Sequence, residues 1–173
     1  LDWEKDYQPA EGLDYITDGS VIRLFHYKQE VNLHTHMIPS HVSRGNYEVS
    51  GYGSEEIGDL KDDWIVEIVR QIDSSDPDYP KEDYNVLHPV STFFRLKNKE
   101  LGCYLTSTGF SYPTWGFQQA EIVCKYSWSK HDKSTWWNVE EHWNDNLPID
   151  SDWHPPSSNL WTDFVMTNFA MAS

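Results

Sequence analysis

Two stretches of the chain, residues 21–36 (VIRLFHYKQEVNLHTH) and residues 93–108 (FFRLKNKELGCYLTST), carry the same pattern. An offset of 72 residues aligns Arg23 with Arg95, and the leucine that follows each arginine is shared as well. Matching blocks that recur at one period indicate a repeat architecture, in which each unit is one supersecondary module.

The match continues farther along the chain with a shift of one residue. At an offset of 73, Glu48 aligns with Glu121, and residues 63–67 (DWIVE) align with residues 136–140 (WWNVE). The units are therefore modules of about fifty residues. We assign 1–19 to the tail of an earlier module, 20–72 and 86–142 to two complete modules, 73–85 to an acidic insertion and 143–173 to a C-terminal extension.

The period inside each module is two residues, which is the period of a β-strand. In residues 31–36 (VNLHTH), apolar side chains alternate with Asn32, His34 and His36, so we expect one buried face and one outward, polar face. Turn residues separate further β-rich runs. These runs cover 21–25, 49–52, 64–69, 93–96, 122–125 and 136–139, and they predict an all-β domain.

Composition limits the class of protein. The 28 acidic and 13 basic residues give a net charge of −15, which argues against a nucleic-acid partner because phosphate binding needs clustered Lys and Arg. Mean hydropathy is −0.69, and no run approaches eighteen apolar residues, so we expect no transmembrane helix and a soluble domain.

Trp64 and Trp137 occupy the same position in the two modules. We expect both indoles in the core, because a Trp side chain buries roughly 150–250 Å² and dominates whatever it packs on. Trp3, in the sequence LDWE, resembles the residues around Trp64. For this reason we interpret residues 1–19 as the tail of an earlier module whose first strands are absent.

Several short segments carry a family resemblance. In the first module they are 18–26 (DGSVIRLFH), 32–36 (NLHTH), 47–53 (YEVSGYG), 58–59 (GD) and 62–64 (DDW), which together resemble a MIR motif. In the second module, 101–105 (LGCYL), 113–119 (PTWGFQQ) and 137–140 (WNVE) are similar to the following motif of the same domain. The strings LGCYL, WGFQQ and NDNLP (144–148) resemble protein O-mannosyltransferases of the fungal type.

The resemblance implies a β-trefoil of three MIR modules, of which two are complete here and the first is largely missing. It places the domain on the lumenal side of an endoplasmic reticulum membrane enzyme. The enzyme would transfer mannose from dolichyl phosphate mannose to Ser or Thr. The domain itself would be non-catalytic and would need no cofactor, and its partners would be the rest of the mannosyltransferase and a second mannosyltransferase subunit.

The two cysteines fit this compartment. Cys103 shares its strand parity with Leu105, and Cys124 shares its parity with Ile122, so both thiols are expected to point inward. Together with the lumenal resemblance, an even count and this parity favour a Cys103–Cys124 disulfide over two buried thiols.

The strongest candidate for a binding site is the polar face of residues 31–36. Asn32, His34 and His36, with Tyr47 and Glu48 as neighbours, could bind the hydroxyls of a glycan or an acceptor polypeptide. The histidines could instead be surface residues without a ligand. A zinc site would need a third ligand, such as His26 or His41. The second module has Thr106-Ser107-Thr108 at the equivalent place, so we expect any site in the first module only.

Catalysis by the domain itself is not supported by any motif. Asp62 and Asp63 are adjacent, so on a strand they would face opposite ways, unlike the facing carboxylates of a glycosidase. Together with Asp59 they are expected to order the loop before Trp64 through side-chain hydrogen bonds to the backbone. Two functions from different classes therefore remain: a module that binds glycan or acceptor polypeptide, and a structural spacer or subunit-interaction module without a ligand.

Two remaining segments give simpler expectations. Residues 73–84 (DSSDPDYPKEDY) are acidic and have no apolar period, so they are interpreted as a surface insertion. In 157–172, Leu160, Trp161, Phe164, Val165 and Phe169 recur at near-helical spacing. They predict a short C-terminal helix that packs on the domain or connects to a membrane span.

Overall fold

The computed structural model describes residues 16–26, 29–54, 56–71, 85–88, 91–116, 119–142 and 164–168. These residues form strands β1 (Val21–Ile22), β2 (Phe25–His26), β3 (Val31–Pro39), β4 (Tyr47–Tyr52), β5 (Trp64–Gln71), β6 (Thr92–Asn98), β7 (Tyr104–Ser111), β8 (Ala120–Lys125), β9 (Trp137–His142) and β10 (Phe164–Asn168). Short 3₁₀ helices η1 (Leu60–Asp62), η4 (Thr114–Gly116) and η5 (Lys133–Thr135) lie in the connections. The predicted all-β class is confirmed.

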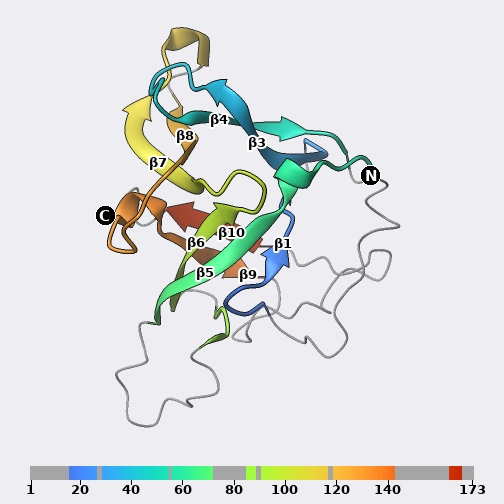
Figure 1. Cartoon of the computed structure of the whole chain (residues 1–173), viewed down its shortest axis with the longest axis vertical. Coiled ribbons are helices and arrows are strands. Elements are labelled where there is room, and N and C mark those ends of the chain that lie inside the picture. Colours follow the sequence, from blue (N-terminus) through green and yellow to red (C-terminus); the bar gives the residue numbers. More distant parts are fainter. Residues whose placement is uncertain are drawn as a thin grey trace.

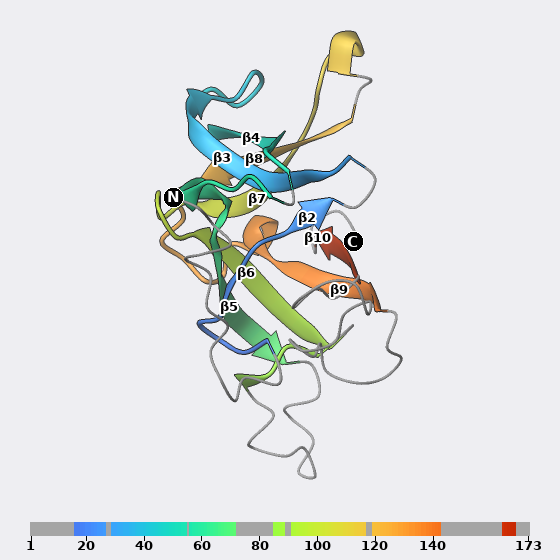
Figure 2. The same ribbon diagram turned by 90° about the vertical axis from the view of Figure 1, so that its right-hand side faces the viewer.

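The strands form one strongly curled antiparallel sheet in the order β1-β5-β6-β7-β8-β4-β3-β2, and β9 joins β6 to β10. Hairpins β3–β4 and β7–β8 lie together at one end of the molecule, and β5, β6 and β9 lie at the other (Figure 1, Figure 2). The hairpins meet where Tyr47 pairs with Cys124 and Glu48 pairs with Val123. Turn η4 projects beyond the hairpin end (Figure 2).

The two modules use the same packing contact at their conserved tryptophan position. The indole Nε1 of Trp64 donates to the carbonyl oxygen of Leu33 at 3.0 Å, and that of Trp137 donates to Leu105 at 2.9 Å. Both indoles are buried, with exposures of 0% and 6%. Residues that align in the sequence therefore make the same hydrogen bond in both modules. The prediction of two core tryptophans is confirmed.

The turn before each of these tryptophans is also built in the same way. In η1 a side-chain oxygen of Asp59 accepts a hydrogen bond from the backbone N–H of Lys61, and in η5 Asp132 accepts from Ser134. Such a capping bond satisfies a backbone donor that the short helix leaves unpaired. The aspartates therefore order these turns, as the sequence predicted for the loop before Trp64.

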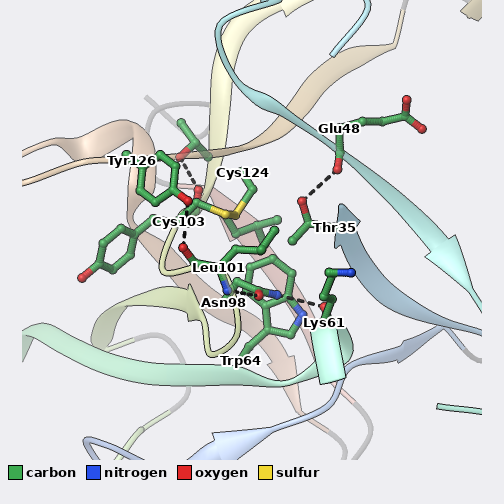
Figure 3. The surroundings of a disulfide bond; sticks show 12 residues. Thr35, Glu48, Lys61, Trp64, Asn98, Leu101, Cys103, Cys124 and Tyr126 are labelled. Atoms are coloured by element: carbon green, nitrogen blue, oxygen red, sulfur yellow. Dashed lines mark hydrogen bonds between the residues drawn. A yellow bond between two sulfur atoms is a disulfide. The ribbon is translucent and has the colours of Figure 1, made fainter. Parts of the chain in front are cut away.

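The core lies between the two ends of the curled sheet. Its buried apolar residues are Ile16, Trp64, Val66, Leu87, Phe94, Leu96, Cys103, Leu105, Cys124, Trp137 and Val139. Cys103 and Cys124 form a disulfide within this cluster and link β8 to the turn that precedes β7 (Figure 3). The bridge lies directly beside the contact between the two hairpins.

The predicted C-terminal helix is wrong for residues 164–168. They form β10, which pairs antiparallel with β9, with Val165 opposite Glu141 and Met166 opposite Val139. The edge of β9 offers unpaired backbone groups, and the β-branched and aromatic residues of this segment suit a strand, so sheet pairing overrides the helical spacing. The rest of 157–172 and the insertion 73–84 lie outside the described residues.

Candidate binding site

The first two predicted ligand residues, Asn32 and His34, are buried in β3. Asn32 is 4% exposed, and its Nδ2 donates hydrogen bonds to the carbonyl oxygens of Ser54 (3.0 Å) and Ile57 (3.2 Å). His34 is 5% exposed, and its Nδ1 lies 2.8 Å from Oδ1 of Asp62. Both side chains hold the connection between β4 and β5 against the strand.

The contact between His34 and Asp62 belongs to a closed polar cluster. The ring of Tyr52 stacks on His34 with centroids 4.6 Å apart, and Oδ2 of Asp62 accepts from the backbone N–H of Asp59 at 2.8 Å. Burial raises the pKa of Asp62, although the hydrogen bond with His34 acts in the opposite direction. The side chains in this cluster bind one another and stabilise the fold, so a ligand would have to displace them.

The expectation that the polar face of β3 points outward is therefore wrong for Asn32 and His34. The strand has two covered faces, because Leu33 packs on the core while the connection after β4 folds over the opposite side. Gly53 makes this possible: its φ of +71° and the adjacent carbonyl of Ile57 leave no room for a side chain.

His36 and Glu48 remain accessible, and the structure adds His41 to them. Nε2 of His36 lies 3.7 Å from Oε1 of Glu48, and Nε2 of His41 lies 3.9 Å from Oε2. Both distances exceed a hydrogen bond. Nε2 of His36 is buried and has no hydrogen-bond partner among the described residues. The carboxylate of Glu48 points away from the disulfide (Figure 3). The carboxylate of Glu48 and the imidazole of His41 therefore retain capacity for a ligand, whereas Nε2 of His36 is covered and would need the ring to move.

Trp115 completes this surface, and the sequence did not single it out as a site residue. It lies in η4, its side chain is 62% exposed, and its ring makes an edge contact with His41 at 5.2 Å. The ring centroid of Tyr112 lies 5.8 Å from that of Trp115. The available signal was the string PTWGFQQ, but the sequence alone did not show that this loop reaches the hairpin of the first module.

Glu121 fixes the loop that carries His41. Its Oε2 accepts hydrogen bonds from Ser40 Oγ (2.6 Å), the Ser43 N–H (2.9 Å) and the Val42 N–H (3.2 Å). Its Oε1 accepts from Thr108 Oγ1 at 2.9 Å. Glu121 itself is fully buried. One carboxylate of the second module thus anchors the β3–β4 loop of the first.

The charge of Glu121 is maintained by these contacts. Burial alone would raise the pKa of its carboxyl group, but the hydrogen bonds from Ser40, Ser43 and Thr108 outweigh burial and lower the pKa below its ordinary value. An ionised Glu121 therefore keeps His41 in place beside Trp115.

The fifth predicted residue, Tyr47, does not share this surface. It is half-buried and packs against the core, and its ring contacts Tyr126 edge-on at 5.9 Å. Adjacent residues of a strand point to opposite faces, so Tyr47 points away from the face that carries Glu48.

We call His36, His41, Glu48 and Trp115 the His–Trp surface. A carboxylate accepts hydrogen bonds from hydroxyls or amides, imidazoles donate or accept, and an exposed indole stacks on the apolar face of a sugar or on a side chain. The set is suited to binding. Among the described residues no group of three His, Cys, Asp or Glu side chains is placed to hold a metal ion.

The open pair of His36 and Glu48 has no counterpart in the second module. Thr108 takes the place of His36 in the second module, and its hydroxyl donates a hydrogen bond to the carboxylate of Glu121. In the first module the equivalent pair, His36 and Glu48, stays apart and half-exposed. The prediction of a site in only one module is consistent with this difference, while ligand binding itself remains a prediction.

Two β-hairpin modules, each packed on an equivalent buried tryptophan, define an all-β repeat domain. The chain belongs to the MIR domain family, whose profile matches residues 4–147. No helix in the described part of the chain is long and apolar enough to cross a membrane.

The relatives of this chain are protein mannosyltransferases. It is 61% identical to dolichyl-phosphate-mannose–protein mannosyltransferase 6 of Saccharomyces cerevisiae, over 99% of this chain and 24% of the relative. It is 45% identical to mannosyltransferase 3 of the same yeast, over 92% of this chain and 20% of the relative. The chain therefore spans about a quarter or less of these proteins.

Two solved structures resemble the fold. The S. cerevisiae protein O-mannosyltransferase Pmt1-Pmt2 complex bound to the sugar donor matches with a TM-score of 0.62 and 35% identity, over 83% of this chain and 20% of that one. The SDF2-like protein from Arabidopsis thaliana matches with a TM-score of 0.63 and 23% identity, over 83% of this chain and 69% of that one. The second likeness concerns the fold alone.

Proposed function

We propose that the chain is the accessory MIR domain of a protein O-mannosyltransferase and that it binds glycan or acceptor polypeptide for the transfer of mannose to Ser or Thr. The 61% identity to a yeast mannosyltransferase over almost the whole chain supports this parentage. The domain supplies recognition, and the transfer step belongs to another part of the enzyme.

The observation that carries the binding role is the His–Trp surface. Trp115 is 62% exposed, and burying part of such a large ring against a ligand is favourable. Beside it, the carboxylate of Glu48 has no close hydrogen-bond donor in its imidazole neighbours, and Nε2 of His36 lacks a partner. A hydroxylated ligand would bond to the carboxylate of Glu48, and rotation of the His36 ring would bring its buried Nε2 within reach.

Binding at such an open surface is expected to be weak. A few hydrogen bonds and one stacking contact to a flexible, hydrated ligand give a dissociation constant of about 1 mM, or about 4 kcal/mol. Within the enzyme, tethering raises the local concentration of substrate near a separate catalytic centre, so weak binding is sufficient.

The proposed setting follows from the relatives and the disulfide. We place the domain in the lumen of the endoplasmic reticulum, where a buried disulfide such as Cys103–Cys124 is stable. The proposed architecture is a β-trefoil with the first repeat largely missing from this chain. Since a similar domain occurs in the Pmt1-Pmt2 complex, we propose a second mannosyltransferase subunit as partner.

One observation favours a structural spacer as a second candidate. Asn32 and His34, at the centre of the predicted site, make hydrogen bonds that stabilise the fold. These structural contacts account for both residues without a ligand. A spacer would act by holding subunits or the lumenal face in place, and the exposed residues would then contribute nothing to substrate use.

The two candidates are separated by kinetics of the full-length enzyme. Trp115→Ala and Glu48→Gln are expected to raise the KM for an acceptor peptide severalfold with kcat nearly unchanged, because they remove ground-state binding away from the reacting atoms. Glu56→Gln, which removes an exposed carboxylate elsewhere, is the matched control. An unchanged KM in both variants would favour the spacer.

A further inference from the structure

A hollow, separate from the His–Trp surface, is lined by residues of the second module and by Glu67 of the first. It has a volume of about 540 Å³. Small-molecule sites span roughly 300–1,000 Å³, so one or two sugar rings fit it. Its defining side chains are Glu67, Arg95, Lys97, Tyr104, Trp128 and Lys130. None of them belongs to the surface proposed above.

The floor of the hollow is a fixed polar network around Arg95, which is 1% exposed. Its Nη2 donates to the carbonyl oxygen of Ser127 at 3.0 Å, and its Nε donates to Thr135 Oγ1 at 2.9 Å. Its guanidinium lies 3.5 Å over the ring of Tyr104. The hydroxyl of Tyr104 donates to Glu67 at 2.7 Å. The floor is therefore preorganised without a ligand.

Tyr104 keeps its hydroxyl proton at neutral pH. Burial and the nearby carboxylate of Glu67 raise the pKa of Tyr104 to about 12, so its hydroxyl keeps its proton. The side chain of Glu67 is 20% exposed, and it lies 3.4 Å from Nη1 of Arg95. Its outward lone pairs remain available as acceptors for ligand hydroxyls.

The rim of the hollow is aromatic and cationic. Trp128 is 97% exposed, which leaves nearly the whole indole in water. Lys130 is 66% exposed, with Nζ 3.8 Å from Glu67, and Lys97 also lines the hollow. With Arg95 in the floor, three cations therefore line the hollow beside one carboxylate, in a chain whose net charge is −15. Such a local reversal of sign concentrates anions at the hollow.

We propose that this hollow binds an anionic saccharide, a sugar that carries a phosphate or carboxylate group. The sugar ring stacks on Trp128, its hydroxyls bond to Glu67, and its anionic group lies near Lys97 and Lys130. A wholly acidic peptide is disfavoured because the carboxylate of Glu67 in the floor would repel it, whereas the same carboxylate accepts hydrogen bonds from the hydroxyls of a sugar.

The test follows the indole N–H signal of Trp128 by NMR in the full chain, with the signal assigned by its loss in Trp128→Phe. The probes are mannose 6-phosphate, glucuronate, mannose and inorganic phosphate. Mannose 6-phosphate is expected to shift this signal and to bind about tenfold tighter than mannose, because charge-assisted hydrogen bonds are the strong ones. Glucuronate binding would extend the ligand class to carboxylates, and its failure would restrict the class to phosphates.

Variants then assign the anion contact. The double variant Lys97→Gln, Lys130→Gln is expected to weaken mannose 6-phosphate binding by about tenfold or more. Arg44→Gln with Arg70→Gln removes two exposed positive charges elsewhere and is the matched control. Equal binding of mannose and its phosphate, equal shifts with inorganic phosphate alone, or an unmoved Trp128 signal would each overturn the proposal.

Discussion

At the scale of single residues, two glutamates at equivalent repeat positions have opposite roles. Glu121 is buried and accepts four hydrogen bonds, two of them from backbone N–H groups of the loop at 40–43. Glu48 faces two imidazoles at distances too long for hydrogen bonds. Glu121 therefore anchors a loop of the fold, whereas the carboxylate of Glu48, at the equivalent repeat position, is left available.

The anchoring role predicts a pH-dependent loss of stability in Glu121→Gln. At pH 7 the variant should lose about 1–3 kcal/mol of unfolding free energy, because charge-assisted hydrogen bonds become weaker ones. The folded-state pKa of Glu121 lies below its ordinary value of 4.5. Its contribution is therefore complete above pH 4.5 and is lost as the pH falls through the folded-state pKa.

Urea denaturation of both proteins between pH 7 and pH 3 measures this difference. The difference between the two free energies of unfolding should shrink as the pH falls below 4.5. A constant difference at all pH values would show that the glutamate acts through packing and not through its charge.

The buried histidine gives a second prediction at this scale. His34→Ala leaves the carboxyl group of Asp62, which is fully buried, without its side-chain partner and removes the stack with Tyr52. We expect a loss of about 2–4 kcal/mol in unfolding free energy. His36→Ala, whose side chain is 29% exposed, should cost less than about 1 kcal/mol. Similar losses in chemical denaturation of the two variants would contradict the assignment of His34 to the fold.

At the scale of elements, the period-two pattern predicted the strands well but not the environment of both faces. The strands containing Trp64 and Trp137 were visible because apolar residues and turn residues mark them. The burial of Asn32 and His34 was not visible, because it depends on the connection after β4 folding back over β3. Alternation shows which residues share a face, while the segment that covers that face is set by tertiary structure.

Tertiary structure also decides the C-terminal segment and the candidate site. Residues 164–168 became a strand because β9 offered an edge to pair with, which no local pattern reveals. His36 and Glu48 could be proposed from the sequence. Trp115 could not, because its contact with His41 joins residues from two different modules.

The disulfide supports a prediction for the hairpin element. Cys103 and Cys124 are 21 residues apart, and closing a loop of this size stabilises the folded state by about 3 kcal/mol through the unfolded chain. Cys103→Ala with Cys124→Ala should therefore lower the free energy of unfolding by about this amount. Reductant should have a comparable effect on the wild type and almost none on the double variant, as urea denaturation with and without reductant would show.

At the scale of the whole molecule, two exposed aromatic surfaces serve a domain with a strongly negative charge. The His–Trp surface carries a carboxylate and histidines at the hairpin end, and the hollow carries lysines around Trp128. These surfaces share no residues, so variants of one surface leave the side chains of the other intact. The sheet and the Glu121 contact hold the first surface together across the two modules.

The most direct test of the central claim is an NMR titration of the isotope-labelled chain with a Ser/Thr acceptor peptide and with its α-mannosylated form. We predict that at least one of them shifts the indole N–H signal of Trp115 with a dissociation constant of about 1 mM. The shift should weaken in Glu48→Gln and persist in Glu56→Gln. If neither ligand moves the Trp115 signal while the spectrum shows a folded domain, the surface is not a binding site and the domain acts as a spacer.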